Sequence, residues 1–550
     1  MIYACDFETT TDENDCRVWA AGAYDIDTGE FIYYNTIDKF MNMIFKKRPS
    51  KIYFHNLKFD GEFILSWLFT NGYKYCNSFK LDDDKTFTTL IGDMGQFYCI
   101  KVRNKTKVIN ILDSLKIIPM EIREMPKAFG LNINKLELEY SKSRKNNYVL
   151  EETEIDYLYN DCKILALSLK SLFNQGLTHM TQAGNAFADF KSFYKKKEYD
   201  RYFPPPYYDS DIRQAYRGGY VFVNPKYKNK ELGEGLVLDI NSMYPWVMYT
   251  CLLPYGEGVF FMGKYEYDEF YPLYVQQFTA IFRIKEGYLP TVQIKHNISR
   301  FVPTEYITGS GDEPVALCMT SVDFKIFMEH YEIEEIEYIA GWKFKGTTEL
   351  FKKYIDKWYT IKQNASREGN RGLRTIAKLM LNALYGRFAL RCEVKSKIPS
   401  LGDDGIIHYS DSDTTVRDPV YIPVAVFITA YARAKLISSA QSVYDRFIYC
   451  DTDSLHILGT EIPDNLEIDD TKLGAWKVEN HFTRAKFIRA KTYIEIIDNK
   501  LSVTCAGLPA KSHKLVTFDN FRHGQSYGGK LRPKRVKGGI VLVDTLFTIK

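Results

Sequence analysis

The stretch Tyr449-Cys450-Asp451-Thr452-Asp453-Ser454 lies between two runs of β-forming residues, 446–448 and 455–458. Asp-Thr-Asp-Ser has the composition of a turn, so we expect two strands joined by a tight hairpin. Residues two apart on an extended chain point the same way, which places the carboxylates of Asp451 and Asp453 side by side. Two such charges repel unless a cation lies between them, and oxygen ligands suit Mg²⁺. An acidic surface turn is the alternative, because turns favour Asp.

The length and composition predict a large globular protein. At 550 residues the chain is too long for a single core, so we expect three or more domains. A hydrophobic content of 45% and a charged content of 26% are ordinary for such a protein. The net charge of +4 does not by itself indicate nucleic-acid binding, so any phosphate-binding surface must come from local clusters. The aromatic content of 15% is high, and these rings could be core or stacking platforms for bases.

Cysteine spacing and apolar runs indicate the cellular compartment of the protein. The ten cysteines form no C-x-x-C pair, and we interpret them as reduced thiols of a cytosolic protein. The longest apolar run, residues 420–432, falls short of the ~20 residues of a membrane helix. The N-terminus begins directly with a strand pattern and does not resemble a signal peptide, so we expect no membrane association.

The N-terminal third carries four acids that an α/β pattern would bring together. Asp6 and Glu8 come at the end of a predicted buried strand, two residues apart. Asp60 follows a second strand and precedes an apolar helix. Tyr157 and Asp161 are four apart in a long helical segment, so they share one face. Each acid alone could be a helix cap or a surface charge, but together they supply the ligands of a two-metal phosphoryl-transfer site.

These residues resemble, in the same order, the three motifs of proofreading 3′–5′ exonucleases. The matches are Asp6-Phe7-Glu8, Asn56-x-x-x-Asp60 and Tyr157-x-x-x-Asp161. The resemblance implies a ribonuclease-H-like fold, a water-orienting Tyr157, a catalytic-site lysine at Lys135, and metal ligation by Asp6, Glu8, Asp60 and Asp161. It also implies contacts with a single-stranded 3′ end from Thr9, His55, Asn56, Phe59, Ser114, Leu115 and Tyr140. Phe59 and Tyr140 suit base stacking, although either could be packed core.

The central segment offers a third acid for the predicted metal site of Asp451 and Asp453. An apolar strand ends at Asp239, which could join Asp451 and Asp453 in a metal site, and Tyr244 in the following helix could pack under a sugar ring. Upstream, Tyr216-Arg217-Gly218-Gly219 allows a close backbone approach, and its arginine could meet a phosphate. A plain Gly-Gly turn is the alternative.

Residues 352–388 are strongly helical in pattern, with a basic, glycine-containing interruption at 367–372. Arg374 and Lys378 are four apart and share a face, and Tyr385 lies two turns beyond Lys378. This face would offer positive charge to phosphates and a ring to a base. A solvated basic helix face is the alternative interpretation.

These stretches resemble, in order, motifs A, B and C of family B DNA polymerases. The matches are Asp239-x-x-Ser-x-Tyr-Pro, Lys378-x-x-x-Asn-x-x-Tyr-Gly and Tyr449-x-Asp-Thr-Asp-Ser. The resemblance implies metal ligation by Asp239, Ile240, Asp451 and Asp453, and nucleotide binding by Tyr244, Arg374, Lys378 and Tyr385. Further motif matches imply DNA contacts from Tyr216, Arg217, Gly218, Gly219, Thr429, Arg433, Lys491 and Tyr493. Ala383 stands where many relatives have Ser, and Arg374 where close relatives have Lys.

Two insertions resemble those of the protein-primed branch of the family, the replicative polymerases of small tailed phages. Residues 293–344 separate motif A from the helical segment, and residues 393–418 form a Gly/Asp/Ser-rich hairpin between motifs B and C. The resemblance implies that the first insertion contacts a priming terminal protein and that the second encircles the DNA. Such enzymes are processive and displace the non-template strand unaided.

The implied architecture is an α/β and α+β multidomain fold, in which a ribonuclease-H-like exonuclease domain precedes a palm, fingers and thumb with two insertions. The expected domains are 1–181 (exonuclease), 182–260 (first part of the palm), 261–349 (palm and first insertion), 350–392 (fingers), 393–418 (second insertion), 419–505 (second part of the palm) and 506–550 (thumb). Five cations within residues 530–537 predict phosphate binding by the thumb, with a solvated patch as the alternative.

The expected enzyme is therefore a protein-primed replicative DNA polymerase of a linear viral genome, with proofreading and two Mg²⁺ ions per active site, for which Mn²⁺ may substitute. Its expected partners are template and primer DNA, deoxynucleoside triphosphates and a terminal protein. We expect a monomer, or a heterodimer with that protein, in the cytoplasm of the infected host bacterium. A repair polymerase of the same family and a non-catalytic DNA-binding scaffold are the alternatives. Carboxylates at all seven expected metal positions argue against the scaffold.

Overall fold

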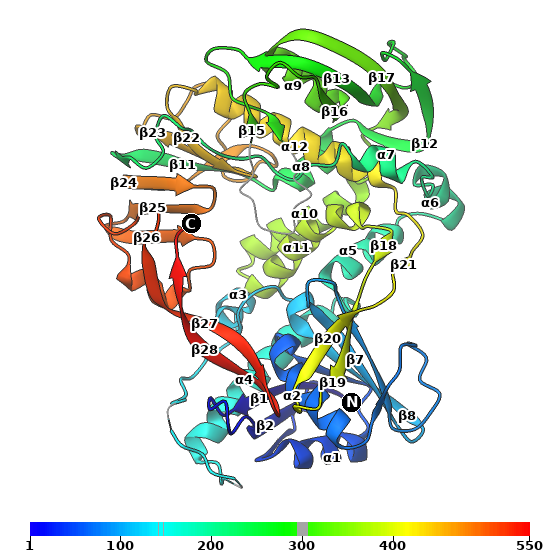
Figure 1. The fold of residues 1–550 in the computed structure, drawn as a ribbon, viewed down its shortest axis with the longest axis vertical. Helices are drawn as coiled ribbons and strands as arrows, with labels where there is room; N and C mark the ends of the chain where they lie inside the picture. Colours follow the sequence, from blue (N-terminus) through cyan, green and yellow to red (C-terminus); the bar gives the residue numbers. More distant parts are fainter. Residues whose placement is uncertain (141, 147, 294–305) are drawn as a thin grey trace.

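The computed structural model describes residues 1–140, 142–146, 148–293 and 306–550, which form two halves connected by helices and by two hairpins (Figure 1). The N-terminal half is built on an eight-stranded sheet in the order β3-β2-β1-β4-β8-β7-β6-β5. β1 pairs antiparallel with β2 and parallel with β4. The strands are β1 (Ile2–Thr9), β2 (Val18–Asp25), β3 (Phe31–Tyr34), β4 (Lys51–Phe54), β5 (Lys74–Tyr75), β6 (Thr86–Ile91), β7 (Phe97–Asn104) and β8 (Lys107–Asp113).

Two acids of this half lie inside elements rather than after them. Because β1 stays paired with β2 as far as Thr9, Asp6 and Glu8 belong to the strand that we expected to end before them. Asp60 lies in the first turn of a helix that begins earlier than predicted, at Leu57. The helices are α1 (Ile37–Lys47), α2 (Leu57–Thr70), η1 (Ser114–Lys116), η2 (Ile122–Glu124), α3 (Met125–Phe129) and α4 (Glu152–Phe173).

The second half contains another eight-stranded sheet, in the order β26-β25-β24-β11-β23-β22-β9, with β10 paired to β24. The long helix α12 (Ile422–Ser442) packs against β22, β23 and α8 (Met243–Thr250). It is long and apolar enough to cross a membrane, but 72% of its apolar window is buried inside the molecule, so it is a core helix here. The strands are β9 (Val221–Val223), β10 (Glu231–Leu232), β11 (Gly235–Ile240), β22 (Phe447–Asp451), β23 (Ser454–Leu458), β24 (Trp476–Arg489), β25 (Thr492–Ile497) and β26 (Lys500–Cys505).

A four-stranded sheet, β12-β17-β13-β16, lies at the far end of this half, with α9 (Ser321–His330) against it (Figure 1). Part of the predicted first insertion, residues 294–305, lies outside the described residues. The sheet begins at Leu253, before residue 261, where we expected the domain that carries this insertion to start. Its strands are β12 (Leu253–Met262), β13 (Leu273–Ile284), β16 (Val315–Thr320) and β17 (Tyr331–Thr347), and a small pair consists of β14 (Val292–Gln293) and β15 (Tyr306–Ile307).

Helices connect the two halves. The chain beyond the expected division at residues 181 and 182 is well packed, because Phe190 is fully buried and stacks on Phe351 with ring centroids 4.9 Å apart. The predicted helical segment is confirmed, with its interruption between α10 and α11. The connecting helices are α5 (Gln182–Lys191), α6 (Lys196–Tyr202), α7 (Asp209–Arg213), α10 (Lys352–Arg367), α11 (Arg371–Ala383) and η3 (Tyr385–Ala389).

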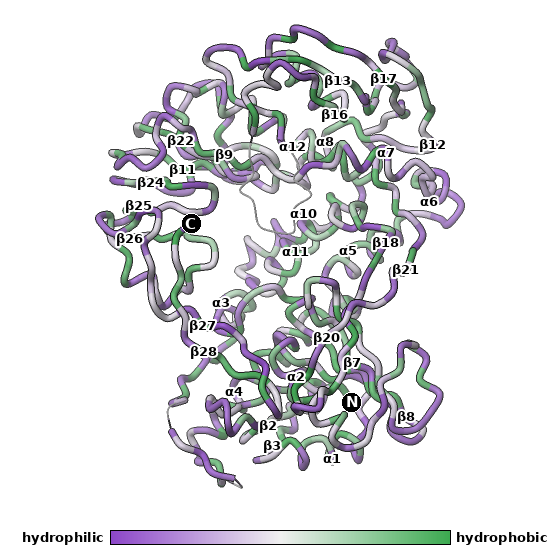
Figure 2. The backbone as a smooth tube through the Cα atoms, viewed as in Figure 1, coloured by the Kyte–Doolittle hydropathy of each residue, from purple (hydrophilic) through white to green (hydrophobic). Residues whose placement is uncertain are grey.

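Two hairpins from the second half reach down to the N-terminal sheet (Figure 1). Ile407, Val536 and Ile540 at their tips are buried in the same cluster as the core strands of that sheet. Figure 2 shows hydrophilic residues on strands at the periphery, such as β17, as well as on loops. The elements are β18 (Glu393–Val394), β19 (Lys397–Leu401), β20 (Ile407–Asp411) and β21 (Thr415–Val416) in the first hairpin, and η4 (Ala510–Leu515), β27 (Ser526–Val536) and β28 (Gly539–Thr548) at the C-terminus.

Candidate active sites

Three carboxylates converge where strands β11 and β22 end. Asp239 lies opposite Ser454 of β23, and Asp451 is the last residue of β22. The turn between β22 and β23 carries Asp453, whose main-chain carbonyl accepts a hydrogen bond from the Ile240 amide at 2.8 Å. The pKa of Asp453 is raised to about 6, first by burial and then by the charges of Asp239 and Asp451. The predicted hairpin is confirmed, and it brings its acids beside Asp239.

Lysines balance two of these three charges. Lys477 Nζ lies 3.2 Å from the carboxylate of Asp239, and Lys491 Nζ lies 2.5 Å from that of Asp451. Among the described residues, no lysine or arginine forms an ion pair with Asp453. Three carboxylates in one place with incomplete charge balance are a donor set that fits a hard divalent cation. Ile240 could contribute only its main-chain carbonyl to such an ion.

A second loop packs against the tip of the β22–β23 hairpin. Thr452 has a left-handed backbone with φ of 59°, and its amide donates to the carbonyl of Tyr220 at 2.9 Å. A Cβ atom on Gly219 would lie 2.6 Å from Thr452 Oγ1, whereas one on Gly218 would meet no atom within 4 Å. The close approach that the glycine pair predicted therefore requires only Gly219.

Thr429 and Arg433 lie on α12, almost fully buried. The Thr429 hydroxyl donates to main-chain carbonyls of its own helix. Arg433 forms a bidentate pair with Asp323 at 2.7 and 2.8 Å and donates to the carbonyls of Arg217 and Gly218. Arg433 therefore holds the 216–219 loop, and the DNA contact expected of these two side chains stays a prediction. The Arg217 guanidinium itself turns back onto the main chain of that loop.

Aromatic rings lie beside the carboxylates. Tyr244 and Tyr385 stack with ring centroids 4.0 Å apart and planes 20° apart. We expected Tyr385 on the same helix as Lys378, but α11 ends at Ala383 and Tyr385 opens η3 instead. On the other side, Tyr493 packs against Tyr449, whose hydroxyl donates to Asp451 at 3.1 Å.

The second acid group lies in the N-terminal half. Asp6 and Glu8 on β1 and Asp161 on α4 bring ligand atoms within 4.8 Å of one another. Lys135 Nζ holds Asp161 Oδ2 at 2.5 Å, whereas Asp161 Oδ1 is buried without a hydrogen-bond partner. A buried orphan oxygen beside two further carboxylates fits a divalent cation, which would satisfy it. Asp60 lies outside the group of three, yet the charge of Asp6 contributes to raising its pKa.

Burial dominates the ionisation of this second group. The pKa of Asp6 is raised to about 7, first by burial and then by the charge of Asp161, while Lys135 partly offsets the rise. Burial, followed by the charge of Asp6, also raises the pKa of Glu8 well above its ordinary value. The Tyr157 hydroxyl lies 3.2 Å from that of Tyr140, and burial raises its pKa, so it stays protonated.

The residues expected to contact a 3′ end differ in accessibility. His55 and Ser114 use their polar atoms internally: His55 Nε2 donates to the Met120 carbonyl at 2.8 Å, and the Ser114 hydroxyl lies within hydrogen-bond distance of both His55 Nδ1 (3.0 Å) and the Phe54 carbonyl (2.8 Å). Burial lowers the pKa of His55 to about 4, so its ring is neutral. Of the whole set, Ser114 is buried, Asn56 and Tyr140 are exposed, and Thr9, His55, Phe59 and Leu115 are half-buried.

Relatives of known identity place the chain in a family. The family described as "DNA polymerase type B, organellar and viral" matches residues 41–149 and 137–471. The chain is a family B DNA polymerase. It is 44% identical to the DNA polymerases of Bacillus phages Nf and phi29, over 100% of this chain and 99% of each relative. It is 32% identical to the DNA polymerase of Streptococcus phage Cp-1, over 100% of this chain and 98% of that relative.

The solved structure of phi29 DNA polymerase complexed with primer-template DNA has a TM-score of 0.94 to this polymerase at 43% identity, covering 100% of both chains. The predicted identity is confirmed: the polymerase is a protein-primed family B enzyme of the phi29 type, with proofreading, that replicates a phage genome. The multidomain α/β fold is confirmed with it.

The polymerase carries two cations that sequence reasoning missed. The pKa of Lys362 on α10 is lowered to about 8, first by burial and then by the neighbouring charges of Arg374, Lys378 and Lys477. Lys362 and Lys477 therefore belong to one positive cluster with the two predicted cations. Helical periodicity could not find them, because Lys362 precedes the interruption between α10 and α11 and Lys477 lies on a strand.

Proposed function

We propose that the polymerase adds deoxynucleotides at Asp239, Asp451 and Asp453, which hold two Mg²⁺ ions and accept Mn²⁺ in their place. When bound, the ions activate the primer hydroxyl and stabilise the pyrophosphate leaving group. The observation that carries this proposal is the convergence of the three carboxylates with the positive cluster of Lys362, Arg374, Lys378 and Lys477. The acids suit metal binding, and the cations suit the triphosphate.

Each neighbouring side chain has a positioning task. Arg374, Lys378 and Lys362 bind the triphosphate oxygens. The stacked rings of Tyr244 and Tyr385 form the floor under the sugar and leave no space for a 2′-hydroxyl, a role that their 4.0 Å stacking supports. Lys491 orients the Asp451 carboxylate. Together with Tyr493, it also steadies the primer terminus. The loop from Tyr216 to Gly219 contacts the same DNA.

Proofreading takes place at Asp6, Glu8, Asp60 and Asp161, which hold the ions of a second site. Lys135 fixes the Asp161 carboxylate, and the protonated Tyr157 hydroxyl positions the attacking water. The 3′ end lies over the accessible side chains Thr9, Asn56, Leu115, Phe59 and Tyr140, of which the last two stack on bases. His55 and Ser114 shape this channel from below, since their polar atoms bond within the protein.

The domain division follows the two sheets. We assign the N-terminal sheet with α2 and α4 to a ribonuclease-H-like exonuclease domain, residues 1–181. The second eight-stranded sheet, within 182–260 and 419–505, is the palm, and helices α10 and α11 within 350–392 are the fingers. Residues 261–349 carry the first insertion, 393–418 the second, and 506–550 the thumb. Support comes from the acids, since each group includes residues of a different one of the two large sheets, Asp6 and Glu8 of β1 in one and Asp239 of β11 in the other.

The first insertion is the docking site of a terminal protein that supplies a Ser, Thr or Tyr hydroxyl as the first primer. On its sheet, Phe260 and Met262 of β12 are 49% and 74% exposed, and Tyr207 beside them is 80% exposed. Phe260 and Tyr207 pack on Trp342, with ring centroids 5.3 and 5.6 Å away. An exposed aromatic patch of this kind is typical of protein interfaces. The polymerase acts as a monomer or in a heterodimer with that protein, in the cytoplasm of the infected bacterium.

A basic cavity supports unaided strand displacement. A cavity of about 910 Å³ lies between the N-terminal sheet, η3 and the base of the 393–418 hairpin. A cavity of this volume accommodates a ligand of drug-like size. It therefore suits single-stranded DNA rather than a DNA duplex. The downstream template enters here and the displaced strand is left outside. Its lining combines three acids, Asp93, Glu393 and Asp418, with a larger set of five cations: Lys116, Arg387, Arg391, Lys395 and Arg417.

Extension of a primed single-stranded circle, with Mg²⁺ and all four nucleotides but no helicase or clamp, tests the proposal. We expect products much longer than the circle, their loss in Asp239→Ala, and retained synthesis without proofreading in Asp6→Ala. Products that stop at the primer's 5′ end would favour a repair polymerase. Undiminished synthesis by Asp239→Ala would contradict the assignment of the site.

Initiation on the terminal protein tests the docking site separately. The Phe260→Ser/Met262→Ser variant should lose labelling of the terminal protein by the first nucleotide, with extension of a DNA primer unchanged. Equal loss of both reactions would indicate a folding defect, and no loss of labelling would exclude this patch.

A further inference from the structure

Lys477 is held opposite Asp239 by the register of the sheet. Residue 477 on β24 and residue 239 on β11 are direct antiparallel partners, so their side chains leave the same face of the sheet. The lysine Nζ lies 3.2 Å from Asp239 Oδ1. The two side chains are 34% and 23% exposed, which leaves a divalent ion free to reach the carboxylate from solvent.

The ion pair distinguishes Asp239 from the other two acids. Asp451 is held by Lys491 and also accepts a hydrogen bond from Tyr449, so its orientation does not depend on one partner. Within the described chain, the only ion pair of Asp239 is that with Lys477. Lys477 is also among the charges that lower the pKa of Lys362, so it neighbours the cations proposed for the triphosphate as well as Asp239.

We propose that Lys477 is a positioning residue that holds the Asp239 carboxylate in the metal-free site and competes with the divalent cation for its Oδ1 atom. The inference rests on the proposed role of Asp239 as a metal ligand. Before the ion binds, the lysine keeps the Asp239 carboxylate pointing toward the metal site that it shares with Asp451 and Asp453. This limits the entropic cost of ordering the carboxylate when the ion arrives. When the ion binds, the lysine must give up the carboxylate, so metal binding is weaker than the three acids alone would give.

Manganese binding to the free polymerase tests this competition. The background is Asp6→Asn/Asp161→Asn, which removes the binding site of the N-terminal half, and bound Mn²⁺ is measured from the loss of the free-ion EPR signal. Partly exposed ion pairs are weak, so Lys477→Met should tighten the first Mn²⁺ by about 2–5-fold. Lys477→Arg keeps the charge and should bind Mn²⁺ like the background. In single-nucleotide incorporation, the Mg²⁺ concentration for half-maximal rate should fall by the same factor in Lys477→Met.

Lys343→Met is the matched control, because Lys343 on β17 of the four-stranded sheet forms a similar half-buried pair with Asp268 at 2.6 Å. It should leave Mn²⁺ affinity unchanged. Unchanged or weaker binding in Lys477→Met would overturn the inference. Failure of the metal-site assignment would look different: Asp239→Asn would then also leave Mn²⁺ affinity at the background value.

Discussion

At the scale of single residues, the two acid groups balance their charge differently. Asp239 and Asp451 are each paired with a lysine, and both carboxylates are partly exposed to solvent. In the N-terminal half, Lys135 serves a more deeply buried group that includes Asp6 and Glu8, and the pKa values of these acids rise further. The exonuclease centre should therefore depend more strongly on pH and on metal than the polymerase centre.

Asp6→Asn should stabilise the metal-free polymerase increasingly as the pH rises. A carboxyl group with a folded pKa of about 7 and an ordinary value of 3.8 contributes most to stability below the lower value. That contribution is lost between pH 3.8 and about 7, because the unfolded carboxyl group ionises there while the buried one stays protonated. In EDTA, the Tm of Asp6→Asn minus that of the wild type should grow by a few degrees between pH 4 and 7 and then level off.

Added Mg²⁺ should reverse the sign of this Tm difference above pH 7, because only the wild-type carboxylate gains an ion. Asp15→Asn, at an exposed position of the same half, is the control and should show no such trend. A Tm difference that stays constant from pH 4 to 8 would contradict the raised pKa of the buried Asp6 carboxyl group.

Tyr244→Val should admit ribonucleotides. Stacking on Tyr385 holds the ring in place, and with the sugar bound above it as proposed, removing the ring opens space for a 2′-hydroxyl. Steric exclusion of one small group is worth about 10–200-fold in discrimination. The kcat/KM ratio of dGTP to GTP, measured on one primer-template, should fall within that range with little change for dGTP. If both nucleotides lost activity equally, Tyr244 would support the active site without selecting the sugar.

At the scale of elements, the β22–β23 hairpin illustrates what local sequence can predict. Its strands and turn follow from β-formers flanking Asp-Thr-Asp-Ser, and the helical segment follows from its period. The partner of the turn could not be predicted, because it depends on Thr452 meeting a loop more than 200 residues away. For the same reason, Lys362 and Lys477 were missed while Arg374 and Lys378, one turn apart on one helix, were found.

Gly219→Ala should impair polymerisation, whereas Gly218→Ala should not. The added methyl group at 219 would lie 2.6 Å from Thr452 Oγ1 and displace the turn that carries Asp453, but at 218 it would enter open space. Single-turnover incorporation should fall by about 10-fold or more for a displacement of this kind, with exonuclease activity on single-stranded DNA retained. Equal rates for the two variants would show that the loop yields without moving the carboxylates.

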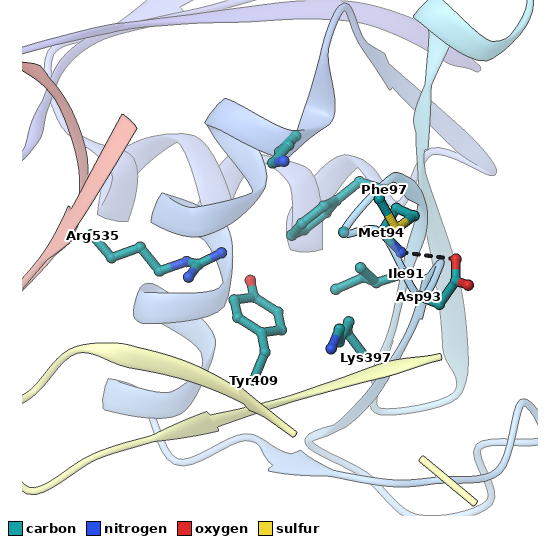
Figure 3. Close-up of a pocket in the computed structure, with 9 residues that line it drawn as sticks. Ile91, Asp93, Met94, Phe97, Lys397, Tyr409 and Arg535 are labelled. Atoms are coloured by element: carbon teal, nitrogen blue, oxygen red, sulfur yellow. Dashed lines mark hydrogen bonds between the residues drawn. The ribbon is translucent and has the colours of Figure 1, made fainter. Parts of the chain in front are cut away.

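At the scale of the whole molecule, the two hairpins close the space between the halves. Their tips contact each other as well as the N-terminal sheet, since Arg535 lies over the Tyr409 ring at 4.5 Å beside a cavity of about 360 Å³ (Figure 3). The sequence predicted phosphate binding by residues 530–537, but Lys534 pairs with Glu13 and Arg535 with Glu62. Residues 62 and 535 are 473 positions apart, and no local pattern indicates such a pair.

Arg535→Ala should lower processivity without lowering the rate of a single incorporation. Arg535 Nε lies 2.8 Å from the Glu62 carboxylate, which is 1% exposed, so the variant leaves a buried acid unpaired and favours opening of the hairpins. A hydrogen bond to a charged group contributes about 1.5–3 kcal/mol, and losing even part of it would raise the open fraction several-fold. Product length on a primed circle with a DNA trap should shorten accordingly.

Lys534→Ala is the control on the same strand, because both partners of its pair are well exposed and the pair contributes little. Shortened products from both variants would assign the effect to lost positive charge rather than to closure between the hairpin and the N-terminal half.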